Sequence, residues 1–452
     1  MRDIFLTIII FVLAGYSLKQ SRFGIYAWSF LSYMNPHRFT WGFAYSMPFA
    51  QIIAVATLIG ILFSKEPKRI PLTGLTLLWM LFIGWMILTT ITALHPEYAA
   101  PQLNKVIKIQ LVTFLTIVVI RKNIDLRILI WVIAFSVGFF GIKGGIFTIA
   151  TAGAHMVWGP PGSFIEDNNE LALALLMVLP LFLYLSSSVK AKYIKYGLFL
   201  CMALIAVSII GSQSRGAFLA IIVTGFFLWL KTPNKLLSGS IIILLAALTF
   251  SFMPQSWYDR METIQNYEED ASAMGRIYAW EMAVNVANNR VVGGGLNMWV
   301  PDVYQTYSGY ERVWVNAKVA HSIYFSVLGE HGWLGLILFL AIFLAAWRTS
   351  SYIVRRGRSN PDLVILAQMI QVSLVAYASG GAFLSLTYFD LAWHLIAILV
   401  ISRAIVDSEV VGLEGTGGDS SERSKVRRYG AVRTSPPLNI GHHRPVGNGK
   451  RT

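Results

Sequence analysis

The chain has 452 residues, of which 55% are hydrophobic and only 13% are charged. A soluble domain carries about 25% charged residues, so this composition excludes a soluble globular protein. The net charge of +14 is expected in loops at one membrane face rather than on a nucleic-acid-binding surface. We therefore expect no nucleic-acid partner. Cys201 is the single cysteine, so no disulfide forms within the chain.

Apolar runs recur from residue 4 to residue 406, with short polar breaks between them. A bilayer core needs about 20 apolar residues per helix, so the runs predict an all-α polytopic membrane protein with about 12 or 13 transmembrane helices. The first two runs are short, and one of them is expected to cross only half of the membrane. The predicted spans are residues 3–18, 22–34, 46–63, 72–94, 105–120, 128–150, 169–187, 196–212, 216–230, 238–253, 321–347, 363–384 and 389–406.

Lysines and arginines concentrate in alternate loops, for example at 64–71, 188–195 and 348–362. The positive-inside rule places such loops in the cytoplasm, so the loops between them face outward. The longest outward loop, 254–320, is rich in Trp, Tyr and Met. We expect it to hold one or two helices that pack on the membrane domain through apolar residues such as Ile277, Trp280, Met282 and Val284.

These features predict four regions. The N-terminal transmembrane helices occupy 1–253, the large loop 254–320, and the C-terminal transmembrane helices 321–406. Residues 407–452 are rich in Gly, Ser and Arg, which is typical of a disordered segment, so we expect a basic cytoplasmic tail there.

Several cations lie on or near the predicted outer face, where the positive-inside rule does not explain them: Arg38, Lys105, Lys108, Lys143, Arg215, Arg276, Arg290, Arg312 and Lys318. Lys143 lies within a predicted span, and charged groups in spans usually line a cavity or a site. Lys105 and Lys108 share one helix face, and Arg215 starts a helix. Cations at helix N-termini suit a phosphate or diphosphate ligand. The alternative is that they are interfacial residues that contact membrane lipids.

His321 ends the long loop and starts a predicted span. The positive end of a helix dipole disfavours imidazolium, so we expect a neutral ring that accepts a proton. Glu330 lies about two and a half turns further along that helix. The alternative for His321 is a hydrogen-bonded interfacial histidine.

A third patch, at 158–170, combines Gly and Pro with acidic residues. An N-cap explains Asp167 and Asn168, but it does not explain why Asn169 and Glu170 enter a span. No HExxH motif or Cys/His cluster is present in the sequence, so we expect neither a metal nor another cofactor.

The sequence resembles the O-antigen ligase and polymerase superfamily of membrane glycosyltransferases. The resemblance rests on Ser-Arg-Gly at 214–216, Gly275-Arg276 followed by Trp280, Gly-Gly-Gly-Leu at 293–296, and the segment from His321 to Gly335. Residues 32–38, 63–69 and 158–170 are more narrowly similar to O-glycosylation ligases associated with exosortase A. The resemblance covers about residues 1–405.

The resemblance implies a GT-C-like, multi-pass enzyme of the bacterial inner membrane whose active site faces the periplasm. Such ligases move a glycan from an undecaprenyl-diphosphate carrier to an acceptor hydroxyl, with inversion and without a metal. The family's diphosphate-binding arginines correspond to Arg215 and Arg276, and its essential histidine corresponds to His321, as base or as orienting group. Arg290 and Arg312 match the family less closely. The sugar is open, and the acceptor is a glycan, a lipid or a protein.

Two other functions fit the same residues. An O-antigen or exopolysaccharide polymerase would use the same chemistry with a growing glycan as acceptor. A transporter or flippase for lipid-linked sugars would not need His321 and would require cations along the whole membrane path. The unexplained cations gather on one side, which favours an enzyme.

Overall fold

The computed structural model describes residues 1–232, 271–308 and 318–429, together with scattered residues between 234 and 258. The chain divides into two compact units, residues 1–406 and 407–452. The described helices are α1 (Arg2–Lys19), α2 (Ser21–Met34), α3 (Phe49–Phe63), α4 (Gly74–Ile91), α5 (Pro96–Val119), α6 (Asn123–Ala150), α7 (Asn168–Ser188), α8 (Lys192–Gly211), α9 (Arg215–Lys231), α12 (Ala271–Asn289), α13 (Pro301–Tyr307), α14 (Ile323–Arg356), α15 (Pro361–Gly381) and α16 (Asp390–Tyr429). No strand occurs among these residues, so the predicted all-α class is confirmed.

Among the described residues, eight helices are long and apolar enough to cross a membrane: α4, α5, α6, α7, α8, α14, α15 and the first part of α16. The predicted spans at 3–18, 22–34, 46–63 and 216–230 coincide with α1, α2, α3 and α9. The last three of these have 14, 15 and 17 residues, and α1 has charged residues at both ends. The structure therefore supports eight of the predicted 12 or 13 spans. The predicted span at 238–253 lies largely outside the described residues. Of the predicted tail, 407–452, residues 407–429 form the end of α16, and the rest lies outside the described residues.

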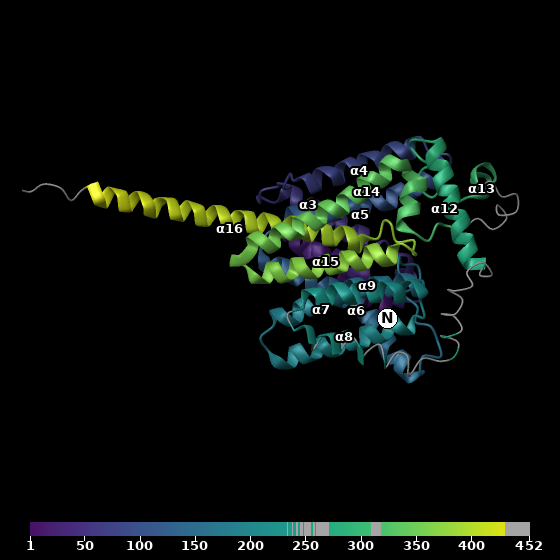
Figure 1. Ribbon diagram of the computed structural model, residues 1–452, viewed down its shortest axis with the longest axis horizontal. Coiled ribbons are helices and arrows are strands. Elements are labelled where there is room, and N and C mark those ends of the chain that lie inside the picture. The colour runs from purple at the N-terminus through teal and green to yellow at the C-terminus, as the bar shows by residue number, and fades with distance from the viewer. Residues whose placement is uncertain are drawn as a thin grey trace, which may run out of the picture. The chain divides into compact units, whose positions relative to one another are not determined.

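Helix α7 forms the centre of the helical bundle in the first unit. It packs against α6, α8, α9 and α15, and 78% of its most apolar stretch of 18 residues is buried. A helix that is apolar on every side is buried on every side, and the run from residue 171 to residue 185 has that composition. Helix α14 packs along α4 and α15 (Figure 1).

Helix α14 is broken at Gly332, whose φ of 67° and ψ of −174° are not helical. Its 34 residues would extend about 51 Å as one helix, well beyond the ~30 Å hydrocarbon core. The break leaves a short piece at 323–331 and a membrane-length piece at 333–356. Gly332 touches the backbone of the preceding loop, because a Cβ at this position would lie 2.2 Å from the Val291 carbonyl oxygen.

The described part of the long loop contains two helices, α12 and α13, as predicted, and α12 packs on α14. The predicted packing face was partly wrong. Met282 is buried, but its buried neighbours are Ala279, Ala283 and Val286. Ile277, Trp280 and Val284, spaced by three and four residues, share an adjacent face of the helix and are only half-buried.

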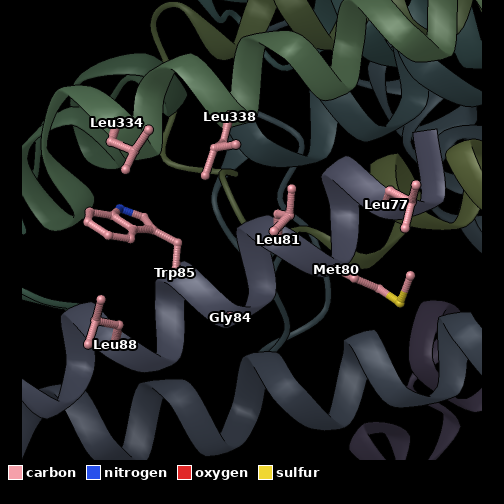
Figure 2. A pocket seen from close by; sticks show the side chains of 8 residues that line it. All are labelled: Leu77, Met80, Leu81, Gly84, Trp85, Leu88, Leu334 and Leu338. Carbon is pink, nitrogen blue, oxygen red and sulfur yellow. The ribbon is translucent and has the colours of Figure 1, made fainter. Parts of the chain in front are cut away.

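An apolar groove of about 580 Å³ lies between α4 and α14 (Figure 2). Its lining residues are Leu77, Met80, Leu81, Gly84, Trp85, Leu88, Leu334 and Leu338. None of these side chains is ionisable, so the groove offers a surface for alkyl chains and no group for proton transfer or phosphate binding.

The break at Gly332 yields a stability prediction. Gly332→Ala places a Cβ in a backbone region that is essentially restricted to glycine, so we expect a loss of about 1–3 kcal/mol and a lower unfolding midpoint in detergent. Gly197→Ala is the matched control, because a Cβ there meets nothing within 4 Å. The control should leave the midpoint unchanged or raise it. Equal midpoints for both variants would contradict a strained break.

Candidate active site at the helix N-termini

One end of the first unit gathers charged side chains from five segments. The group that we call the charged cluster consists of Lys105, Asp167, Glu170, Arg276, Lys318, His321 and Asp390, each within electrostatic range of at least one other member. Four of its members lie at or near the beginnings of α7, α14 and α16. Helix N-termini carry partial positive charge, so this end of the bundle suits an anionic ligand.

His321 lies just before α14, whose N-cap is Ser322. Its backbone is left-handed, with φ at 46°, and its Nδ1 lies 3.4 Å from Oγ of Ser385. Burial lowers the pKa of the His321 imidazole below its ordinary value of 6.5, and the Arg276 and Lys318 cations lower it further, whereas Asp167 acts in the opposite direction. The expected neutral ring therefore results mainly from burial and neighbouring cations.

Helix α12 brings Arg276 to His321. One turn after Arg276, Trp280 donates from Nε1 to the carbonyl oxygen of Ala320 at 2.7 Å, and its ring stacks on Phe325 at 4.8 Å. These two contacts fix α12 against the residues on either side of His321. Gly275 allows the close approach of Lys318, because a Cβ there would lie 3.0 Å from Cδ of that lysine.

Arg215 is the first residue of α9 and is half-buried. The helix starts there because the Ser214 side chain accepts from the amide of Ala217 at 3.2 Å. Asn168 of α7 donates to the Ser212 carbonyl oxygen at 2.7 Å, which fixes the turn beside the start of α7. Gly216 packs on the loop 382–389, since a Cβ there would lie 3.2 Å from Cβ of Phe383. The same loop supplies Ser385 to His321, so Arg215 borders the charged cluster.

The other half of the cluster comes from earlier helices. Nζ of Lys105 on α5 lies 3.7 Å from the centre of the Phe164 ring. Glu170 on α7 and Asp390 at the start of α16 both act electrostatically on this ammonium. Asp390 is buried and accepts a hydrogen bond from the Ser32 hydroxyl. Asp167 caps α7 by accepting from the amide of Asn169 at 2.8 Å, as predicted.

The remaining sequence-predicted residues lie outside the charged cluster. Lys108 reaches Gln51 of α3 at 3.5 Å, and Lys143 is exposed on α6. Arg38 lies over the Tyr45 ring at 4.6 Å, and Asn169 bonds its neighbour Asp167. Arg290 donates to the carbonyl oxygens of Gly293 and Thr92. Arg312 lies outside the described residues.

Glu330 is buried in α14, and protein donors occupy both of its oxygens. The amide of Asn297 and Nε1 of Trp299 donate to Oε1 at 3.0 and 3.2 Å, and the Tyr388 hydroxyl donates to Oε2 at 2.5 Å. His331 joins the same network through Tyr388 at 2.7 Å. A carboxylate bonded in this way ties segments together rather than facing a substrate.

Sequence reasoning missed Asp390 and Ser385. One signal was available for Asp390, because an acid at the first position of an apolar helix repeats the anomaly that singled out Glu170. Phe164 lies in the patch at 158–170 that the sequence singled out, but its contact is with a lysine that is distant in the chain. Within the described residues, no group of three or more His, Cys, Asp or Glu side chains is arranged to hold a metal ion.

The fold defines a multi-pass membrane protein with a polar site at one end of its helical bundle. Comparison with family models refines this class. Residues 1–190 match a model described as a family of unknown function (DUF5935), and residues 199–340 match a model described as O-Antigen ligase. The chain therefore carries an O-antigen ligase family domain. No curated protein matches the chain.

The electrostatic influence of Arg276 on His321 yields a prediction about ionisation. Arg276→Ala removes a cation that lowers the pKa of His321, so that pKa should rise toward its ordinary value. Diethyl pyrocarbonate modifies only the neutral ring, so the midpoint of modification at His321, followed by mass spectrometry, should move to higher pH. Lys108→Ala is the control and should leave the midpoint in place. An unmoved midpoint in Arg276→Ala would show that the two side chains do not interact.

Proposed function

We propose that the protein transfers a glycan from an undecaprenyl-diphosphate carrier to an acceptor hydroxyl at the periplasmic face of the inner membrane. The observation that carries the proposal is that α12, held by the Trp280 hydrogen bond to Ala320, brings Arg276 within electrostatic range of His321, in a region that matches the O-antigen ligase family. Transfer of this kind needs a base for the acceptor proton and cations for the diphosphate that leaves. The charged cluster and the neighbouring Arg215 supply both kinds of group.

The proposed step is a single displacement. The acceptor oxygen bonds to the anomeric carbon as the bond to the diphosphate oxygen breaks, which inverts the configuration of that carbon. The electron pair of the broken bond stays on the diphosphate, where Arg215 and Arg276 stabilise the growing negative charge. Guanidinium groups suit this task, because they bind two phosphate oxygens at once.

His321 is the proposed base for the acceptor proton. When Nδ1 carries the ring proton and donates to Ser385, Nε2 presents a lone pair. The lowered pKa of His321 keeps this lone pair unprotonated at neutral pH. The neighbouring Asp167 favours the imidazolium that forms during transfer, because its carboxylate stabilises positive charge on the ring.

The periplasmic orientation rests on the alternation of Lys/Arg-rich loops, which places the charged cluster outside. We also propose, from the sequence patches at 32–38, 63–69 and 158–170, that the protein is related to exosortase-associated ligases. A polymerase would perform the same step repeatedly. Analysis of product length separates the two activities, because a ligase adds one block and a polymerase extends its product.

Removal of the arginines tests the diphosphate role. Arg215→Ala and Arg276→Ala should abolish transfer, seen as loss of the glycan product in cells, while the protein remains folded in the membrane. Arg→Lys at either position should restore only part of the activity, because lysine lacks the bidentate fork. Lys143→Ala, which changes an exposed cation on α6, should transfer normally. Normal transfer by both arginine-to-alanine variants would rule out this role.

Removal of the histidine tests the base. His321→Ala should lower the rate of transfer by roughly 10²–10⁴-fold and leave donor binding intact. In the unmodified protein the rate should fall as the pH drops through a pKa below 6.5, because protonation fills the lone pair. If His321→Ala loses donor binding together with turnover, the histidine binds the donor and another group is the base.

A further inference from the structure

The transfer step takes place at the charged end of the bundle and makes no use of the apolar groove between α4 and α14 (Figure 2). The groove volume of about 580 Å³ falls within the range of about 300–1,000 Å³ that is usual for ligand sites. Gly84 keeps the groove open, because a Cβ at that position would meet no atom within 4 Å. Trp85 donates from Nε1 to the His331 carbonyl oxygen at 2.8 Å, which ties the two walls together.

The groove has the length and the surface that a lipid chain requires. Its lining residues on α4 run from Leu77 to Leu88, a separation of 11 residues that corresponds to about 17 Å of helix. One leaflet of a bilayer contributes about 15 Å to the ~30 Å hydrocarbon core. Leu81 of α4 and Leu334 of α14 are 61% and 41% exposed, so the groove is accessible from outside. An extended acyl chain therefore fits along it.

Arg290 lies at one end of this groove. Its Nη2 donates to the Thr92 carbonyl oxygen at 2.7 Å, and Thr92 caps α4 one turn after Leu88. The next residue in the loop, Val291, packs on the other wall, because a Cβ at Gly332 would lie 2.2 Å from its carbonyl oxygen. The guanidinium is therefore placed where the walls formed by α4 and by the second piece of α14 both end.

The Arg290 guanidinium keeps both charge and donors for a ligand. Nε donates to the Gly293 carbonyl oxygen at 2.9 Å and Nη2 to that of Thr92, whereas Nη1 contacts no acceptor among the residues that the structure describes. Within the same residues, no carboxylate forms an ion pair with Arg290. A half-buried guanidinium that no carboxylate neutralises suits a phosphate group.

From this arrangement we infer that the groove and Arg290 form a binding site for one glycerophospholipid of the membrane. One acyl chain lies along α4 between Leu77 and Leu88, and the phosphate accepts hydrogen bonds from the Arg290 guanidinium. The lining side chains are uncharged, so the headgroup lies at the end of the groove rather than within it. The inference goes beyond the proposed transfer function, because it adds a second lipid that takes no part in the reaction.

The prenyl chain of the proposed donor is the other lipid that could enter the groove, and the length of α12 favours the phospholipid. Arg276 lies 13 residues before Asn289, the last residue of this helix, and this separation corresponds to about 20 Å. Arg290 follows directly. A diphosphate bound by Arg276 and a phosphate bound by Arg290 would therefore be about 20 Å apart, so one headgroup does not occupy both positions.

Native mass spectrometry of the full-length protein, released from detergent micelles that contain dioleoyl phosphatidylglycerol, measures phospholipid binding directly. Gly84→Leu fills the groove with a side chain whose Cβ clashes with nothing, so it should weaken the binding of one phospholipid about tenfold, as expected when about two methylene groups lose their contacts. Gly197→Leu on α8 is the matched control, because a Cβ there also meets no atom within 4 Å. The control should bind as the unmodified protein does.

Arg290→Gln tests the phosphate contact in the same assay. It should also weaken binding about tenfold, because a charged hydrogen bond is lost. Arg290→Lys retains the cation without the fork, so its affinity should lie between those of the glutamine variant and the unmodified protein, and it serves as the test variant if the glutamine variant does not fold. Lys143→Gln, which changes an exposed cation on α6, should bind normally.

Three results would overturn the site. The first is equal phospholipid affinity in Gly84→Leu and Gly197→Leu. The second is unchanged phospholipid affinity in both Arg290 variants. The third is loss of farnesyl diphosphate binding in Gly84→Leu, which would assign the groove to the prenyl chain of the donor. The assay requires no turnover, so phospholipid binding that depends on Gly84 and Arg290 would stand even if the protein transferred no glycan.

Discussion

The buried carboxylate of Glu330 holds together three segments of the chain. It accepts hydrogen bonds from the loop after α12 and from Tyr388, and it is itself part of α14. Burial of a carboxylate costs several kcal/mol unless its oxygens are bonded, so the three donors are required for this fold. Tyr388 lies in the same short loop as Ser385 and two residues before Asp390. Its position therefore also sets the positions of Ser385 and Asp390.

The membrane class and most of the helices were predictable because apolar length is a local property. Thus α4 through α8 appear near the predicted residues. The ends of the helices depended on less local signals. The break in α14 requires the backbone of Val291 to meet Gly332, and the buried face of α12 is set by the residues around Met298 and Tyr304.

The candidate site was predictable only in part, for a related reason. Arg215, Arg276 and His321 break local rules of charge placement and were therefore visible in the sequence. Glu330 breaks the same rules, yet its partners Asn297, Trp299 and Tyr388 occupy it within the fold. An unusual charge in a span thus identifies a costly residue, and only its three-dimensional neighbours distinguish a ligand-binding group from a structural one.

Most residues of the charged end fall into two separate stretches of the chain, and Asp390 follows both. Arg215, Arg276 and His321 lie within 199–340, and Lys105, Phe164, Asp167 and Glu170 lie within 1–190. The charged end is therefore assembled from segments that match separate family models, and neither matched segment contains all of its residues. A protein that shared only one of these segments would lack part of the charged end.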